Sequence, residues 1–275
     1  MSIPIEELPP IAAEASLRLR DAMVEILGDD LVAMWLHGGT TFADRPARMG
    51  DLDICVVVRS VGADERAPRR WWPDPTSRPK RTIAAHAAVA EELGVEFDTS
   101  YILASEMAGG RLPRGAFRRS RRETSWAVYR AHWLAGQYVQ LFGPGPEALV
   151  GPPTAGELRF ALDRELEHLE AHVQAGDAAD PYEATYAIWN GCRILRTLAT
   201  GSPVSSKRGA GAWALEQLPS GWHPVIRAAG RAYDGAGTAA DAELLRESME
   251  PFVAMVRAQL PHRRQRRSTD GPRWS

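Results

Sequence analysis

The sequence predicts a mixed α/β half followed by an all-helical half. Three short apolar runs of strand length lie in the first 105 residues, and helical segments separate them. Beyond residue 150, the apolar residues recur at helical spacing up to about residue 260. Glycine and proline are frequent between 140 and 155, which is typical of a linker. We therefore expect an α/β domain with a mixed sheet over 1–150, and a helical bundle over 151–262.

The expected elements of the first half begin with an amphipathic helix over 9–27 that ends at Gly28. Strands are expected at 31–36, 51–58 and 95–103, with a helix at 83–93 and an irregular, proline-rich segment at 60–80. In the second half, Thr154 and Glu157 form a capping-box pattern before a helix that runs to about residue 173. Further helices are expected at 183–199, 207–217, 223–233 and 238–260. The basic end, 263–275, is expected to be disordered.

The composition limits the classes of function. With 44% hydrophobic and 25% charged residues, the 275-residue chain has the balance of an ordinary globular protein. Its net charge of −2 gives no general attraction to nucleic acid or to anionic lipid. The two cysteines, Cys55 and Cys192, do not suggest a disulfide framework. No apolar run is long enough for a membrane span, and no signal-peptide pattern is present. We expect a cytoplasmic monomer without membrane or nucleic-acid partners.

A pair of carboxylates provides the first chemical signal. Asp51 and Asp53 stand at the start of a strand whose remainder, ICVVV, is apolar. Residues two apart in a strand share a face, so these two side chains project together. Two adjacent carboxylates repel one another, and a divalent cation removes that cost. Mg²⁺ prefers such ligands together with phosphate oxygens and water.

A third acid is expected from a neighbouring strand, where VEFDTSYIL offers Glu96 and Asp98 on one face. Three carboxylates could hold two metal ions for an in-line displacement on phosphorus, and one could accept a proton from the attacking hydroxyl. The preceding turn, Gly38-Gly39-Thr40, would let backbone N–H groups approach a triphosphate without an intervening Cβ.

Two blocks of the chain resemble a known family. LHGGTTFADRPARMGDLDICVVV fits the strand, glycine turn and D-h-D frame of the nucleotidyltransferase superfamily related to DNA polymerase β. The stretch 189–219, WNGCRILRTLATGSPVSSKRGAGAWALEQLP, resembles the helical domain of streptomycin/spectinomycin adenylyltransferases. The resemblance covers most of 30–235 and implies a nucleotidyltransferase domain followed by a helical domain that closes over ATP.

The resemblance also implies roles for individual residues. Asp51, Asp53 and Asp98 would bind two Mg²⁺ ions, and Asp98 would be the general base, with Glu96 as the alternative. Gly38, Gly39 and Thr40 would bind the nucleotide. Arg193 would reach the site from the helical domain, and Lys207 would neutralise ATP phosphate charge. Glu183 falls where the family places an acid that binds the polycationic aminoglycoside.

Two positions depart from the family pattern. Gly39 replaces a serine that binds phosphate, and Gly50 replaces a serine before the first aspartate. Thr40 or Thr41 is the candidate source of the missing hydroxyl. Independently of the family, Trp126 is a candidate to stack on a sugar or guanidinium group of the substrate. Six arginines between 111 and 122 could bind a polyanion, although a solvated loop explains them as well.

We therefore expect a Mg²⁺-dependent adenylyltransferase that moves AMP from ATP to a hydroxyl of an aminoglycoside-like antibiotic. Two alternatives remain open at this point. The same chemistry could modify a protein or an RNA end, as in nucleotidyltransferases of toxin–antitoxin systems. Loss of both motif serines would also suit a non-catalytic nucleotide-binding module.

Overall fold

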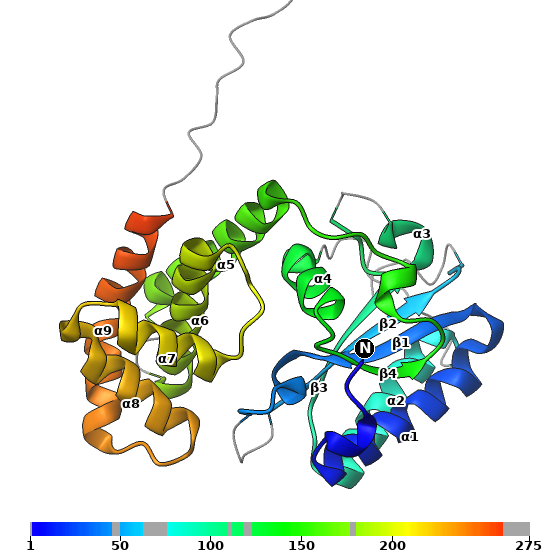
Figure 1. The fold of residues 1–275 in the computed structure, drawn as a ribbon. Coiled ribbons are helices and arrows are strands. Elements are labelled where there is room, and N and C mark those ends of the chain that lie inside the picture. Colours follow the sequence, from blue (N-terminus) through cyan, green and yellow to red (C-terminus); the bar gives the residue numbers. More distant parts are fainter. Residues whose placement is uncertain are drawn as a thin grey trace, which may run out of the picture.

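The computed structural model describes residues 2–45, 50–62, 76–108, 112–117, 123–176 and 180–260. A sheet with its helices forms one region, and a bundle of helices forms the other (Figure 1). The strands are β1 (Leu31–His37), β2 (Leu52–Val58), β3 (Phe97–Leu103) and β4 (Val139–Phe142). The helices of the sheet region are α1 (Pro10–Leu27), α2 (Arg78–Leu93), α3 (Ala104–Met107) and α4 (Trp126–Leu134). Those of the helical region are α5 (Ala155–Ala175), α6 (Pro181–Thr200), α7 (Lys207–Gln217), α8 (His223–Tyr233) and α9 (Ala239–Gln259).

The sheet is mixed, as the sequence predicts. Its strands lie in the order β3-β2-β1-β4. β1 pairs antiparallel with both β2 and β4, whereas β2 pairs parallel with β3. The parallel pair is joined through α2, the crossover helix that such a connection requires. This pairing brings the beginnings of β2 and β3 to the same end of the sheet, and that end carries the acidic residues.

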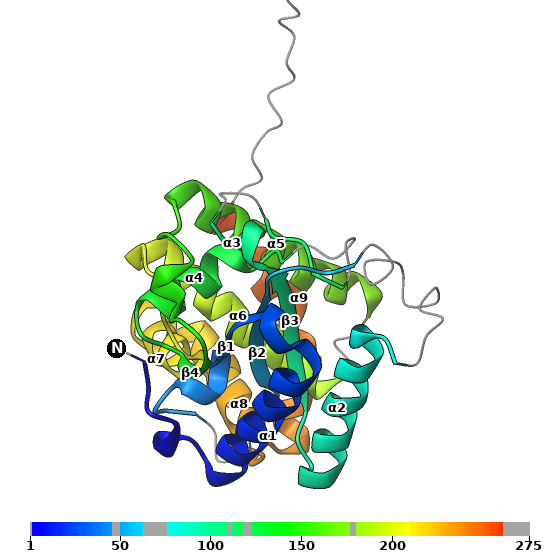
Figure 2. The same ribbon diagram turned by 90° about the vertical axis from the view of Figure 1, so that its right-hand side faces the viewer.

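Each face of the sheet is covered by helices. One face packs on α1 and α2 around a core that includes Leu19, Met23 and Ile54. The other packs on α3 and α4 around Trp35 and Trp133, whose ring centroids lie 5.2 Å apart. Figure 2 shows α1 and α2 together on one side of the strands. Because both faces are covered, the strands are apolar almost throughout, and a charged side chain on them stands out.

The helical region has its own core. Its buried residues all come from 162–260 and include Trp189 of α6 and Phe252 of α9. Thr154 caps α5 as predicted: the Glu157 amide donates to Thr154 Oγ1 at 3.2 Å, and the Thr154 amide donates to Glu157 Oε2 at 2.7 Å. Glu157 also accepts a hydrogen bond from Arg130 of α4, so this cap fastens the two regions together.

The predicted fold class is confirmed, and the differences concern short elements. The sequence patterns do not predict β4, α3 or α4, and α2 begins five residues earlier than expected, at Arg78. β4 has only four residues, too few for a periodic signal. The domain boundaries at 150 and 262 remain predictions. The tail 263–275 and most of the arginine run lie outside the described residues. Within the described part, every helix is too short or too polar to cross a bilayer.

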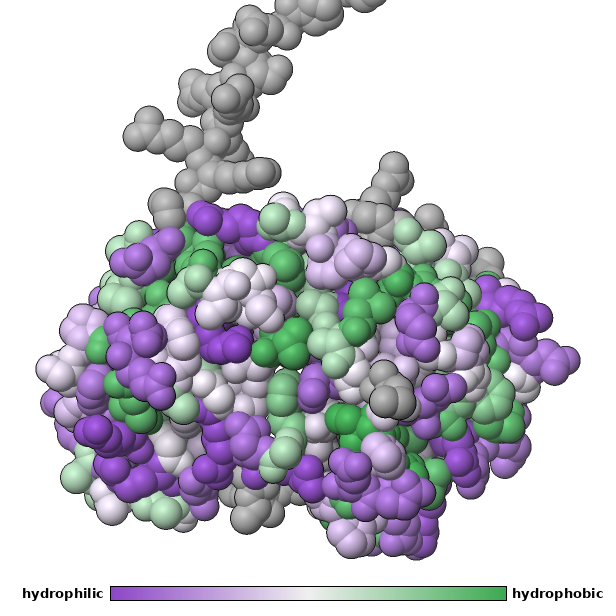
Figure 3. Space-filling model, in the orientation of Figure 1, coloured by the Kyte–Doolittle hydropathy of each residue, from purple (hydrophilic) through white to green (hydrophobic). Residues whose placement is uncertain are grey.

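The surface in the orientation of Figure 1 mixes hydrophilic and hydrophobic residues (Figure 3). Hydrophobic patches on this face are small and are separated by hydrophilic residues. The two regions meet along a shared boundary in this view, and the acidic end of the sheet faces that boundary.

Candidate active site

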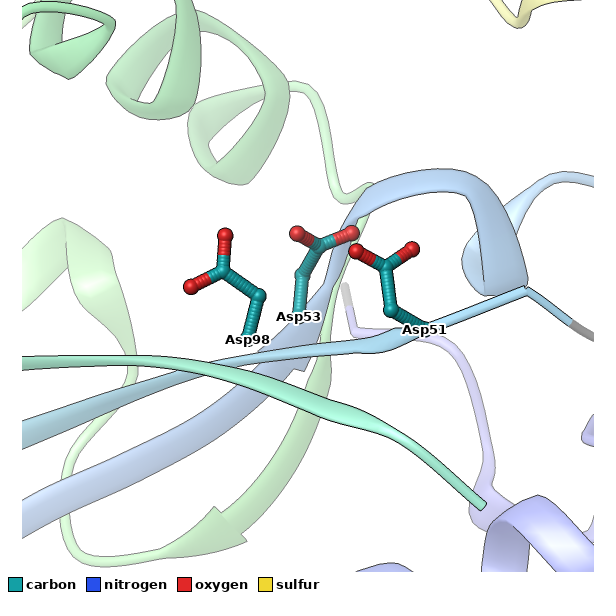
Figure 4. A group of neighbouring side chains, drawn as sticks. All are labelled: Asp51, Asp53 and Asp98. Atoms are coloured by element: carbon teal, nitrogen blue, oxygen red, sulfur yellow. The ribbon is translucent and has the colours of Figure 1, made fainter. Parts of the chain in front are cut away.

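Three carboxylates converge where β2 and β3 begin (Figure 4). In the parallel register of these strands Asp53 lies opposite Asp98, and Asp51 directly precedes β2. One oxygen atom from each carboxylate lies within 4.8 Å of the other two. The structure thus brings the predicted pair together with Asp98. Glu96, the alternative third acid, is not part of this group.

The electrostatics of this acid cluster (Asp51, Asp53 and Asp98) favour a bound cation. Burial, together with the neighbouring carboxylates of Asp51 and Asp98, raises the pKa of the Asp53 carboxyl to about 8. Lys207 and Arg193 act in the opposite direction. Holding three carboxylates this close is costly unless positive charge is added. Three hard oxygen donors suit Mg²⁺, so the cluster fits the metal that the sequence predicts.

The glycine turn forms a short 3₁₀ helix, η3 (Gly38–Thr41), directly after β1. The last residue of β1, His37, pairs with Asp53, so the turn begins beside the acid cluster. Gly38 has a φ of 76°, which favours glycine. The Thr41 hydroxyl donates to the Gly38 carbonyl at 2.8 Å and is therefore engaged within the turn. This leaves Thr40 as the better candidate for the hydroxyl that Gly39 lacks.

Two cations from the helical region face the acid cluster. Lys207 is the first residue of α7, and its Nζ lies 5.2 Å from the ring centroid of Tyr186 and 5.5 Å from that of Tyr233. Burial lowers the pKa of Lys207, and repulsion by Arg193 adds to this, whereas Asp51 and Asp53 oppose it. The sequence-predicted cations therefore lie within electrostatic reach of the carboxylates, although they come from the other half of the chain.

Direct contacts join the two regions beside this site. Ser206 Oγ donates to Asp44 Oδ2 at 2.5 Å. Ser206 Oγ also accepts a hydrogen bond from the Gly209 amide, and this bond caps α7. On the neighbouring helix α4, His132 Nε2 lies 2.9 Å from the Pro203 carbonyl oxygen. The N-terminus of α7, and with it Lys207, is thereby attached to the loop that follows η3.

Glu183 lies in the first turn of α6 beside Tyr182, whose hydroxyl is within electrostatic reach of Asp51. Its carboxylate is 3.2 Å from His172 Nδ1. Partial burial raises the pKa of the adjacent Tyr182, and the carboxylates of Asp51, Glu183 and Glu96 raise it further. Tyr182 is 69% exposed, so its ring stands at an open, acid-lined part of the junction. A role of Glu183 in binding substrate remains a prediction that this position suits.

Trp126 does not fit its predicted role. Its side chain is only 1% exposed and packs edge-on against Trp133 at a centroid distance of 5.3 Å. Both indoles belong to the core between the sheet and α4. Tryptophan side chains serve in core packing as well as in stacking on ligands, and the chain has nine of them. At position 126 the side chain packs in the core.

Several residues near the site were not predicted. Tyr186 and Tyr233 surround the Lys207 ammonium group, and Asp44 and Ser206 join the two regions. Glu123 accepts a hydrogen bond from Ser100 at 2.9 Å beside Asp98. Ser206 carried a usable signal, because a serine before a helical pattern is a typical N-cap. The other contacts join segments far apart in the chain, and no local pattern marks them.

Comparison with known proteins agrees with this arrangement. Residues 149–259 match the family model described as aminoglycoside adenylyltransferase, C-terminal domain. Among solved structures, spectinomycin adenyltransferase AAD(9) from Enterococcus faecialis with ATP and spectinomycin matches with a TM-score of 0.70 and 17% identity. That match covers 90% of this chain and 99% of the other. No curated protein sequence matches the chain. The resemblance predicted from the sequence is confirmed, and both names denote nucleotidyltransferases, the predicted enzyme class.

Proposed function

We propose that this chain, with a helical region that matches the aminoglycoside adenylyltransferase C-terminal domain, transfers AMP from ATP to a hydroxyl of an aminocyclitol antibiotic. The observation that carries the proposal is that three carboxylates from the sheet cluster within electrostatic reach of Lys207 and Arg193 from the helical region. Clustered acids alone would suit many metal sites. The cations of the second region add positive charge, which a triphosphate requires because its own negative charge must also be neutralised.

Asp51, Asp53 and Asp98 would hold Mg²⁺, which supplies charge neutralisation at the phosphates when bound. The residues of the chain position the nucleotide around it. Backbone N–H groups of η3 would donate hydrogen bonds to phosphate oxygens, since this turn begins beside the acid cluster. Lys207 is held between two aromatic rings, which restricts its side chain before ATP arrives and reduces the entropy lost on binding.

Asp98 would act as the general base. It is an exposed member of the acid cluster and lies on the edge strand β3, where an acceptor can approach it. The acceptor hydroxyl oxygen forms a bond to the α-phosphorus while its proton moves to the Asp98 carboxylate. The bond between the α-phosphorus and the bridging oxygen breaks, and pyrophosphate leaves towards Lys207 and Arg193.

The acceptor class follows from charge. The junction on the acceptor side carries Glu183, Glu96 and Asp180 around the exposed ring of Tyr182. A neutral or anionic acceptor would gain little from these acids, whereas a compound bearing ammonium groups would be attracted to them. The solved structure of AAD(9) contains spectinomycin and ATP, which supports an aminocyclitol acceptor for this chain.

The test is direct AMP transfer. Purified protein is incubated with ATP, MgCl₂ and either spectinomycin or streptomycin, and the adenylylated drug is sought by mass spectrometry. We expect one drug to gain one AMP, with EDTA or Asp53→Asn abolishing the product. ATP binding without AMP transfer to any aminocyclitol would contradict the proposed function and favour a nucleotide-binding module.

A further inference from the structure

A pair of histidines on α5 forms a group of metal-ligating side chains outside the acid cluster. His168 and His172 are four residues apart, so their side chains lie on the same face of the helix. Their Nε2 atoms are 3.1 Å apart, and their ring centroids are 4.4 Å apart with the ring planes nearly perpendicular. His168 is exposed and His172 is partly exposed, so an ion in solution can reach the pair.

This separation suits two ligands of one transition-metal ion. Zn²⁺ binds imidazole nitrogen at about 2.0–2.1 Å with tetrahedral geometry, which places two ligand nitrogens about 3.3 Å apart. Only small side-chain rotations separate the observed 3.1 Å from that value. A hydrogen bond between the rings produces a similar distance without any ion. The surroundings of the pair therefore provide the further evidence.

Glu183 selects the nitrogen of His172 that can bind an ion. Glu183 Oε2 lies 3.2 Å from His172 Nδ1, at ion-pair distance although not aligned as a hydrogen bond. A carboxylate in this position favours a proton on Nδ1, so that Nε2 keeps its lone pair on the side of His168. Metal-binding histidines almost always have a carboxylate, a carbonyl or water at the ring nitrogen that does not bind the metal. A hydrogen bond between two histidines has no such requirement.

Tyr186 of α6 holds the ring of His168. The two rings pack edge-on, with their centroids 6.2 Å apart. The Tyr186 hydroxyl donates at 3.1 Å to Glu165, which lies one turn before His168 on α5. These contacts between the two helices restrict the rotamers of His168, and this reduces the entropy lost when an ion binds.

The donor atoms determine the class of ion. Imidazole nitrogen suits Zn²⁺, Cu²⁺ and Ni²⁺, whereas Mg²⁺ prefers oxygen ligands. The two histidines therefore attract a different ion from the one that the acid cluster fits. Among the described residues, no third His, Cys, Asp or Glu ligand atom lies within 4.8 Å of both Nε2 atoms. Water would complete the coordination, as it does at an open zinc site.

We propose that His168 and His172 bind one divalent transition-metal ion through their Nε2 atoms, and that Glu183 orients His172 for this task. The ion would also change the acceptor side of the junction. Glu183 is the predicted acceptor-binding acid, and a divalent cation beside it would weaken its attraction for an ammonium group. This second effect rests on the proposed function, whereas the metal site is independent of it.

The test is Zn²⁺ binding by the untagged full chain, measured by calorimetry without ATP or drug. Excess MgCl₂ is present, so that Mg²⁺ competes for the acid cluster. We expect one Zn²⁺ per chain. His168→Ala should weaken binding at least about 100-fold, because a single imidazole loses the advantage of two linked ligands. Since His168 is exposed, this variant should keep the melting temperature of the zinc-free protein.

Two further variants make the test specific. Glu183→Gln should weaken Zn²⁺ binding about tenfold, the lower end of the range for a residue that orients a metal ligand. His223→Gln, the control, removes a histidine of α8 and should leave the affinity unchanged. In NMR spectra, Zn²⁺ should shift the ring signals of His168 and His172 and leave those of His223 in place. Absence of Zn²⁺ binding, or equal affinity in His168→Ala and the unaltered chain, would overturn the metal site.

The effect on the acceptor is measured separately. Saturating Zn²⁺ should raise the KM of spectinomycin about threefold, as for one solvent-exposed charge, and leave the KM of ATP unchanged. His168→Ala should remove this response and keep the kinetic constants of the zinc-free chain. An unchanged KM of the drug at saturating Zn²⁺ would contradict the effect on the acceptor. Zn²⁺ binding without AMP transfer would support the metal site and contradict the proposed function, and AMP transfer by a chain that binds no Zn²⁺ would do the reverse.

Discussion

Gly38 and Asp53 lie so close together that a Cβ atom added to Gly38 would come within 1.8 Å of Asp53 Oδ2. The glycine therefore provides more than a flexible turn: its missing side chain is the space that the central carboxylate occupies. The turn that would bind the phosphates and the cluster that would bind the metal thus depend on one another at a single point.

Gly38→Ala should damage the site directly. The new methyl group must displace Asp53, and the φ of 76° adds backbone strain of about 1 kcal/mol. We expect kcat/KM for AMP transfer to fall at least about 100-fold, with weaker Mg²⁺ binding by calorimetry. Gly39→Ala is the matched control, since a Cβ there meets no atom within 4 Å. Equal losses in both variants would argue against this steric relationship.

Gly39→Ser should improve the enzyme. The position is open, and serine would place a hydroxyl on the turn where the resembling family carries one. One added hydrogen bond to a phosphate should lower the KM of ATP about threefold to tenfold, because bonds to charged groups are the stronger kind. Steady-state kinetics at fixed drug concentration would measure it. A raised KM would indicate that this chain places its nucleotide differently.

The choice of general base is testable with two neutral isosteres. Asp98→Asn should lower kcat by about 10²–10⁴-fold, the range for losing a positioned base. Glu96→Gln should leave kcat within about threefold, because Glu96 lies outside the acid cluster. If the larger loss came from Glu96→Gln instead, the assignment of Asp98 would be wrong.

The contact between Asp44 and Ser206 should influence ATP binding through the position of Lys207. Asp44→Ala removes the bond between the regions and leaves the cap of α7 intact, because Ser206 Oγ still accepts from Gly209. We expect the KM of ATP to rise about twofold to fivefold, as for an exposed hydrogen bond to a charged group. Asp234→Ala provides the control, since Asp234 pairs with Arg208 within the helical region.

His132 should contribute to a loss of stability in mild acid, whereas the raised pKa of Asp53 acts in the opposite direction. Burial lowers its pKa to about 4, repulsion by Arg193 contributes, and the hydrogen bond to Pro203 opposes the change. The unfolded chain takes up this proton near pH 6.5, so between about pH 6.5 and 4 it binds more protons than the folded protein. The contribution of His132 to the free energy of unfolding should therefore decrease as the pH falls through that window, by roughly 3 kcal/mol at most.

Urea denaturation of the unaltered chain and of His132→Gln at pH 7 and pH 5 would measure this contribution as the difference between the two slopes. His132→Gln keeps a donor for the Pro203 carbonyl but cannot be protonated, so its stability should depend less steeply on pH. His37 and His86 are also buried, with pKa values lowered to about 3 and about 4, and both should preserve part of the slope in that variant. An unchanged slope in His132→Gln would contradict this account.

Local patterns were sufficient for the long elements. The helices after residue 150 follow from apolar spacing and from caps such as Thr154, and the structure places them within a few residues of the predicted bounds. They were not sufficient for α4, WAVYRAHWL, where Trp126 and Trp133 are both buried. Helix 126–134 is therefore largely apolar around its surface and lacks the one-sided pattern by which a helix is recognised.

The third carboxylate shows the same limit within the site. Glu96 and Asp98 are two residues apart, so alternation along a strand cannot separate them. The parallel register of β2 and β3 does so by placing Asp98 opposite Asp53. This register results from packing between segments about 45 residues apart, which no local pattern contains.

By itself, the sequence determined that Asp51 and Asp53 share a face beside a glycine turn, because backbone geometry sets that spacing wherever the strand lies. It also determined the helical half, because apolar periodicity is a property of each segment. Only the tertiary structure decided that Asp98 completes the acid cluster, that Lys207 faces it between two tyrosines, and that Trp126 is core. Each of these depends on which distant segments pack together, and that choice is made by the whole chain as it buries its apolar surface.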